Sequence, residues 1–339
     1  MNNHSPRTSR NDRYYRNSND NSIIICTLII VVLAVVNIKI FSQIITGNPD
    51  VITLATRETT AEEIELAQKQ EAIKRDLKTN FTQITVTTED TKAGNLILVN
   101  NDYAYSFDSS PKVVPKEELV SFSGRQSPVY TVSYPAKETL TVSALENFNA
   151  LAESFAEQTG HKDLFMLDSY RSYEDQERVY ENKGSEIATV PGHSEHHTGL
   201  AFDLELYIGG KTLDFDGTGD YSWVSQNGHR YGYILRYEED KTDYTQISYE
   251  PWHFRFVGKE HAYYMYANNL CLEEYIHLLS RHTADGERLV FETDEGEKYM
   301  IYSQSVSGDS ASVYVPKKLP YTISGDNCGR VVVSCRLSE

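Results

Sequence analysis

The sequence is poor in cysteine and in basic residues, and each scarcity argues against a class of site or partner. Its 339 residues include four cysteines, none in a C-x-x-C pair, which argues against a thiolate zinc site or a thioredoxin-like motif. Lysine and arginine number 32 against 49 acidic residues, a formal net charge of −17. Because binding to a phosphate backbone requires clustered cations, we expect no nucleic-acid partner.

The cysteines near the C-terminus leave one question open. Cys328 and Cys335 are compatible with a disulfide outside the cell. They are equally compatible with unpaired thiols in the core, because sequence alone does not fix the distance between their Cβ atoms.

The N-terminal part predicts a membrane anchor. Residues 1–22 are polar and predict a disordered cytoplasmic tail. Residues 23–45 (IIICTLIIVVLAVVNIKIFSQII) would form a helix about 34 Å long, enough to cross a bilayer core. The arginines before this run predict that the N-terminus lies in the cytoplasm and the rest of the chain outside the cell membrane. A cleaved signal peptide fits less well, because the run is too long for its apolar region and no A-x-A-like site follows.

The remaining chain divides into three parts by amino-acid composition and by the secondary structure that its pattern predicts. Residues 46–80 are rich in Glu, Lys, Ala and Gln and predict an exposed, extracytoplasmic helical stalk. Residues 81–283 alternate between helical and strand-like patterns and predict the main domain, built from both helices and strands. Residues 284–339 contain only short strand-like segments between Gly and Pro, and predict a small β-rich domain.

The clearest element is a helix over 141–158, whose apolar stripe ends before Gly160. Further helices are expected over 174–181, 223–231 and 260–279. Strands are expected over 84–87, 95–100, 162–168, 200–206, 233–237, 253–257, 288–291, 298–302, 312–315 and 330–334.

Two motifs carry residues suited to a catalytic metal. S-E-H-H-T-G-L-A-F-D contains His196 and Asp203, and E-P-W-H ends in His253. Two imidazoles and one carboxylate are typical of a catalytic zinc site, because the fourth position stays open for water. Glu250, three residues before His253, is the natural base for that water.

Taken singly, these residues have a plainer interpretation. A lone His or Asp in a loop is far more often a solvent-facing polar group than a ligand, and E-x-x-H alone is a weak signal. The combination of three ligands, a base and the turn at Thr198-Gly199 favours a metal-dependent hydrolase. His193 and His197 cannot both share an ion with His196, because adjacent positions of an extended chain point to opposite faces.

These motifs resemble those of the VanY-type D-alanyl-D-alanine carboxypeptidases, in the group that includes lysostaphin-like peptidases and the hedgehog signalling domain. The family pattern S-x-H-x-x-G-x-A-x-D matches Ser194–Asp203, E-x-W-H matches Glu250–His253, and Y-R-S-Y-x-x-Q matches Tyr170–Gln176. The resemblance covers about residues 95–280. It implies an α+β fold with a central antiparallel sheet, flanking helices and a metal cleft on the open side of the sheet.

The resemblance also implies a role for each matched residue. One zinc ion per chain would be bound by His196, Asp203 and His253. Glu250 would take a proton from the metal-bound water and pass it to the leaving amine, and Arg171 would stabilise the oxyanion. The residues implied in substrate contact are Ser172, Gln176 and Ser194.

The sequence therefore predicts a membrane-anchored zinc D,D-carboxypeptidase that removes the terminal D-alanine from peptidoglycan stem peptides. An L,D-carboxypeptidase that trims tetrapeptides would use the same residues and stays an alternative. An alternative of another class is a zinc-containing module that binds wall peptides without cleaving them. Glu250 and Arg171 argue against it, because a pure binder needs neither.

Overall fold

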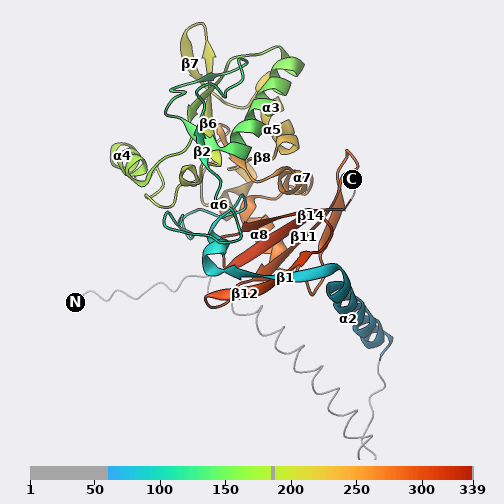
Figure 1. Cartoon of the computed structure of the whole chain (residues 1–339). Coiled ribbons are helices and arrows are strands. Elements are labelled where there is room, and N and C mark those ends of the chain that lie inside the picture. The colour runs from blue at the N-terminus through green and yellow to red at the C-terminus, as the bar shows by residue number, and fades with distance from the viewer. Residues whose placement is uncertain (1–59, 185–187, 338–339) are drawn as a thin grey trace, which may run out of the picture. The chain divides into compact units, whose positions relative to one another are not determined.

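The computed structural model describes residues 60–184 and 188–337 (Figure 1). The chain divides between Ile64 and Glu65 into two compact units, and the second unit contains every predicted site residue. The predicted tail and membrane helix, residues 1–45, lie outside the described residues. Within the described residues, no helix combines the length and the apolar character that crossing a bilayer requires.

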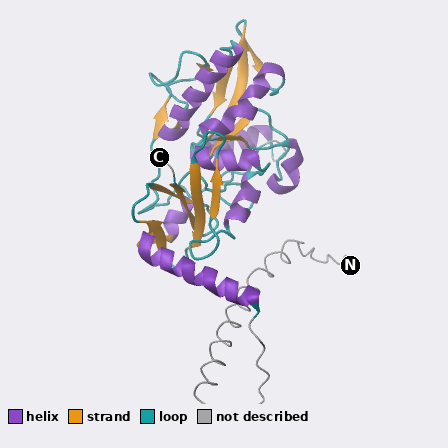
Figure 2. Cartoon of the chain, turned by 90° about the vertical axis from the view of Figure 1, so that its right-hand side faces the viewer, coloured by secondary structure: helices purple, strands orange, loops and turns teal. Residues whose placement is uncertain are grey.

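A sheet at the centre of the second unit positions the site. Its strand order is β3-β5-β6-β9-β8, with β7 paired to β6, and every pairing is antiparallel except that of β3 with β5. The strands are β3 (Thr131–Val132), β5 (Leu164–Asp168), β6 (Ala201–Ile208), β7 (Lys211–Asp214), β8 (Tyr233–Leu235) and β9 (His253–Phe256). The predicted α+β class with a central antiparallel sheet is thus confirmed, apart from one parallel edge. Figure 2 shows that helices, in purple, and strands, in orange, both occur throughout the second unit.

Helix α3 (Val142–Thr159) packs on this sheet as its periodicity predicts. The Thr141 side chain accepts a hydrogen bond from the backbone N–H of Ala144, and Gly160 ends the helix in a left-handed conformation. The predicted apolar stripe is buried, and the Phe148 ring lies 4.6 Å from that of Phe202 on β6. Burying each such side chain contributes about 2 kcal/mol, so α3 holds the sheet by its apolar face.

Shorter elements complete this part of the unit. They are β2 (Leu119–Ser121), β4 (Thr139–Thr141), α4 (Tyr173–Lys183), α5 (Ser222–Asn227) and α6 (Thr242–Thr245). The helix predicted over 223–231 is therefore split, since α5 is followed by a 3-10 turn over Gly228–Tyr231.

The prediction of one long helix over 260–279 is wrong. The chain forms α7 (Lys259–Ala267) and α8 (Leu272–Leu279) instead. Asn269 has a φ of 49°, which no right-handed helix contains. The Glu274 side chain then accepts a hydrogen bond from the backbone N–H of Cys271, and this cap starts α8.

The strand predicted over 95–100 is also absent, although these residues are described and mostly buried. Leu96 and Leu98 enter a core formed with α7 and α8. The carbonyls of Asn95 and Ile97 accept hydrogen bonds from the Arg255 guanidinium at 3.0 and 2.9 Å. The Arg255 side chain therefore satisfies two backbone carbonyls that the apolar pattern predicts to pair within a sheet.

The C-terminal residues are β-rich, as predicted. They contain β10 (Leu289–Glu292), β11 (Lys298–Ser305), β12 (Ser310–Pro316), β13 (Tyr321–Gly325) and β14 (Arg330–Arg336), of which β13 has no counterpart in the sequence pattern. β12 pairs with β1 (Phe81–Thr87), which follows helix α2 (Ala61–Asn80). Ile301 and Val332 share a core with Leu96 and α8, so the boundary predicted at residue 284 runs through a common hydrophobic core.

The described cysteines carry free thiols. Cys271, Cys328 and Cys335 form no disulfide. Of the two alternatives left open for Cys328 and Cys335, the structure therefore has unpaired thiols.

Asp90 fixes an irregular segment that packs, through Val114, against strands β1, β12 and β14. One carboxylate oxygen accepts hydrogen bonds from the backbone N–H groups of residues 112, 113 and 114, at 2.6 to 2.9 Å. The other accepts from the backbone N–H and the hydroxyl of Thr87. Burial alone would raise the pKa of Asp90, but these hydrogen bonds lower it to about 2.

We predict that Asp90→Asn lowers the free energy of unfolding by about 2 kcal/mol at neutral pH, because it removes an ionised acceptor of five hydrogen bonds. A depressed carboxyl pKa stabilises the fold above about pH 4 and loses its effect as the pH falls toward 2. The deficit of the variant should shrink over this range in urea unfolding curves. Glu89→Gln, on the part-exposed neighbour, is the control. Equal stability of Asp90→Asn and wild type at pH 7 would contradict the assignment.

Candidate metal centre

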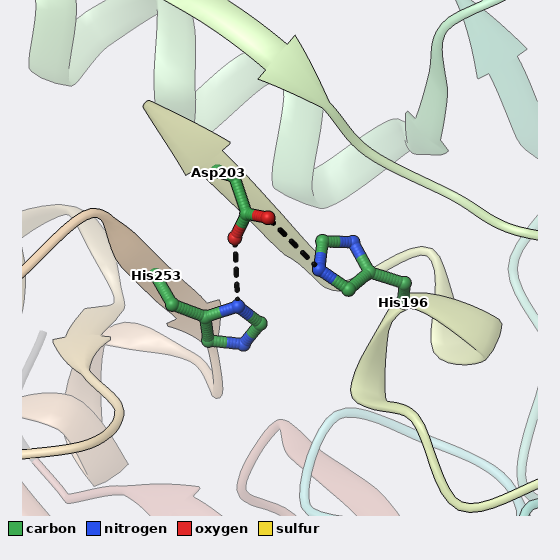
Figure 3. A group of neighbouring side chains, drawn as sticks. All are labelled: His196, Asp203 and His253. Carbon is green, nitrogen blue, oxygen red and sulfur yellow. Dashed lines mark hydrogen bonds and ion pairs between the residues drawn. The ribbon is translucent and has the colours of Figure 1, made fainter. Parts of the chain in front are cut away.

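The pairing of β6 with β9 brings two of the predicted ligands together. In its register, Asp203 lies directly opposite His253. The Asp203 Oδ1 atom is 2.8 Å from His253 Nδ1 (Figure 3). Residues fifty positions apart therefore meet through ordinary strand pairing.

A tight turn brings His196 to the same place. Residues Glu195–Thr198 form a 3-10 turn before β6, and Gly199 ends it with a φ of 67°. The positive φ favours glycine at this position, whereas a Cβ atom would meet mainly the end of the Leu119 side chain, which can move. The turn leaves His196 Nε2 3.4 Å from Asp203 Oδ2. Figure 3 marks this ion pair with a dashed line.

The three residues fit a divalent metal of zinc's kind. One donor atom from each of His196, Asp203 and His253 lies within 4.8 Å of the others. Ligands about 2.1 Å from a tetrahedral zinc stand roughly 3.4 Å apart, so only small shifts separate these atoms from a ligand set. His196 Nδ1 lies 2.6 Å from the carbonyl oxygen of Ser169, which can only accept. His196 therefore keeps its Nε2 lone pair for the centre.

Arg171 supplies a fixed positive charge beside these residues. Its guanidinium donates to Asp168 at 2.8 Å and to Gln176 at 2.9 Å, and lies 3.5 Å from Asp203 Oδ2. Burial alone would lower the pKa of Arg171, but the carboxylates of Asp168, Asp203 and Glu250 raise it. Arg171 is thus held as a cation at the edge of the site.

Two of the three residues expected to contact substrate have other partners in the structure. Gln176 is buried, and its amide donates to the carbonyl of Thr189 at 2.8 Å while it accepts from Arg171. The Ser172 hydroxyl caps α4 and exchanges hydrogen bonds with Asp175. Ser194 is buried at the start of the 3-10 turn. Gln176 and Ser172 therefore orient Arg171 and α4, and substrate contact by these three residues stays a prediction.

Glu250 lies in a turn that closes on His253. Its carbonyl accepts the backbone N–H of His253 at 3.2 Å, and its own N–H donates to the carbonyl of Tyr237 at 3.1 Å. Burial and the Asp203 charge raise the pKa of Glu250, although His253, His196 and Arg171 oppose them. A carboxylate with a raised pKa is a better proton acceptor, as a general base must be. Trp252 in the same turn is 37% exposed, although its position in the motif predicts packing.

His197 faces away from the centre, as expected for a neighbour of His196. Its Nε2 accepts the backbone N–H of Gly192 at 3.0 Å, and its Nδ1 donates to the carbonyl of Arg171 at 2.8 Å. The Phe107 ring packs edge-on against the imidazole. His197 thus supports the backbone that carries Arg171.

A set of buried charges next to His253 was not predicted from the sequence. Glu195 lies 2.8 Å from both Arg236 and Arg255, and all three side chains are fully buried. One signal was available, because Arg255 follows His253 by two positions in an apolar strand and so occupies the same face. Arginine there requires a buried partner.

The chain is similar to known proteins over much of its length. Residues 137–259 match the family model described as VanY, D-alanyl-D-alanine carboxypeptidase. A D-alanyl-D-alanine carboxypeptidase of Enterococcus faecium is 32% identical over 261 residues, which cover 75% of this chain and 79% of the relative. This chain belongs to the VanY family. The resemblance inferred from the motifs is confirmed, and the chain is a peptide hydrolase of the carboxypeptidase kind.

Two further comparisons extend the likeness beyond the family model. The putative carboxypeptidase YodJ of Bacillus subtilis is 36% identical over 192 residues, 53% of this chain and 66% of that protein. The solved structure of the vancomycin-resistance D,D-dipeptidase VanXYg, in complex with a D-Ala-D-Ala phosphinate analogue, superimposes with a TM-score of 0.64 at 27% identity. It covers 76% of this chain and 99% of its own. The VanY-type fold therefore extends well outside residues 137–259.

We predict that the purified VanY-family chain binds one zinc ion and that His253→Ala loses it, because two ligands rarely retain a catalytic metal. Metal content after dialysis, measured by mass spectrometry, tests this. His193→Ala is the matched control, because the His193 ring contacts the carbonyl of Asn100 rather than Asp203. Full zinc occupancy in His253→Ala would show that the ligand set is wrong.

Proposed function

We propose that this protein is a zinc D,D-carboxypeptidase that removes the terminal D-alanine from peptidoglycan stem peptides. The observation that carries the proposal is the meeting of His196, Asp203 and His253, whose donor atoms lie within 4.8 Å of one another. Membership of the VanY family and the D-alanyl-D-alanine carboxypeptidase of Enterococcus faecium support this substrate class.

The metal ligands, Glu250 and Arg171 each have a separate role in peptide hydrolysis. Zinc held by the three ligands would act as a Lewis acid and bring the pKa of a water to about 7. Glu250 takes the proton of the attacking water and then delivers it to the nitrogen of the departing D-alanine, so the proton balance closes within the site. The Arg171 cation opposes the negative charge that develops on the scissile carbonyl oxygen.

We predict that Glu250→Ala retains zinc but lowers the rate of D-alanine release by about 10² to 10⁴, the usual contribution of a general base. Release is measured by mass spectrometry on defined muropeptides, and Glu239→Ala, at an exposed carboxylate, is the control. An undiminished rate in Glu250→Ala would remove Glu250 from the mechanism.

The same assay separates the candidate activities when it uses pentapeptide and tetrapeptide muropeptides in parallel. Trimming of the pentapeptide by the wild-type protein is the expected result. Trimming of the tetrapeptide alone would identify an L,D-carboxypeptidase. Binding of either peptide without turnover would identify a non-catalytic module.

We further propose that residues 23–45 anchor the protein in the cell membrane, with the N-terminus in the cytoplasm and the peptidase outside. The length and apolar character of this run support the proposal, as do the arginines that precede it. The substrate lies on the same outer side.

We predict that the full chain fractionates with membranes and resists extraction by high salt, whereas deletion of residues 1–45 releases an active, soluble peptidase. A hydrophobic span holds a protein in the bilayer independently of ionic strength, unlike a surface charge contact. Release of the full chain by salt, or digestion of its N-terminus by protease added outside intact cells, would contradict the anchor or its orientation.

A further inference from the structure

Glu195 is next to one predicted ligand in sequence and touches the other in space. Its Oε1 accepts hydrogen bonds from Arg236 Nε and from Arg255, both at 2.8 Å. Its Oε2 lies 3.4 Å from His253 Nε2. The carboxylate is fully buried, so each oxygen is committed to a partner within the protein.

The two ring nitrogens of His253 face different carboxylates. Nδ1 points to Asp203 and hence to the predicted metal position, whereas Nε2 points to Glu195. The Tyr237 ring packs against the imidazole with centroids 4.9 Å apart, which limits rotation of the ring. In this orientation only Nδ1 can be a ligand.

A neutral imidazole carries one proton, and the hydrogen bond of one nitrogen decides which nitrogen keeps the lone pair. We propose that Glu195 is a positioning residue of the metal centre: it accepts the Nε2–H of His253 and so directs the Nδ1 lone pair to the metal. The inference rests on the zinc site of the proposed function.

The two arginines that bind Glu195 on the side away from His253 hold its carboxylate in place without help from a metal. Arg236 forms a second, two-pronged ion pair with Glu273 of α8, at 2.9 and 2.6 Å. Arg255 is held by the carbonyls of Asn95 and Ile97. The carboxylate is therefore oriented before a metal arrives, which is what a positioning residue requires.

The network supplies a matched pair of variants. In Glu195→Gln, the amide oxygen satisfies the two arginines, and the NH₂ group is left facing His253 Nε2. A donor there favours the opposite tautomer, with the proton on Nδ1. Glu273→Gln also removes one negative charge beside Arg236, but Glu273 does not touch His253.

We expect zinc affinity, measured by competition with a chelator, to fall by about 10- to 100-fold in Glu195→Gln, the usual effect of losing such a partner. Glu273→Gln should change it by less than about twofold, although both variants should lower the melting temperature. Wild-type affinity in folded Glu195→Gln, or an equal loss in both variants, would overturn the proposal.

A measurement on the wild-type protein decides the question even if Glu195→Gln fails to fold. Long-range ¹H–¹⁵N NMR of the zinc-loaded chain, labelled at histidine, should show His253 protonated at Nε2 and bound to zinc through Nδ1. The reverse assignment would overturn the role of Glu195 while leaving the zinc site intact. Absence of zinc binding by the wild type would instead refute the proposed function.

Discussion

The register between β6 and β9 is the constraint on which the centre depends. A slip of one residue would turn the whole of one strand over, and Asp203 and His253 would then lie on opposite faces. The other face of the same pair fixes this register. Phe202 and Phe254 are also directly opposite each other, are fully buried, and stack with ring centroids 5.8 Å apart. The hydrophobic core therefore aligns the ligands before any metal binds.

The parts of the site that the sequence predicts are those governed by local geometry. A turn ended by Gly199 sets His196 relative to Asp203, and a second turn sets Glu250 relative to His253. The meeting of these two segments depends on strand pairing, which no spacing in the sequence specifies. It could be anticipated only through the resemblance to a family.

The failures of prediction have a common cause, because tertiary contacts override local pattern. Residues 95–100 form an apolar run typical of a strand, yet the carbonyls of Asn95 and Ile97 are satisfied by Arg255, which also donates to Glu195. The break between α7 and α8 falls at Asn269 rather than at a glycine or a proline. Asparagine tolerates a positive φ, but it also occurs within helices, so the sequence does not predict a break there. Gln176 lies between Arg171 and Thr189, a placement that depends on the same kind of long-range contact, and its contact with substrate stays a prediction.

The buried charges behind His253 are hard to explain by stability alone. Two arginines and two glutamates neutralise one another there, but desolvation offsets most of that attraction, and an apolar cluster of similar volume can be as stable. An apolar cluster would leave His253 Nε2 without an acceptor inside the protein, however, and the imidazole would be free to adopt either tautomer. The arginines also join the strand that carries His253 to α8 and to residues 95–97. Helix α8 and residues 95–97, which lie outside the central sheet, thereby contribute to the geometry of a centre whose ligands all lie on that sheet or in the turn before it.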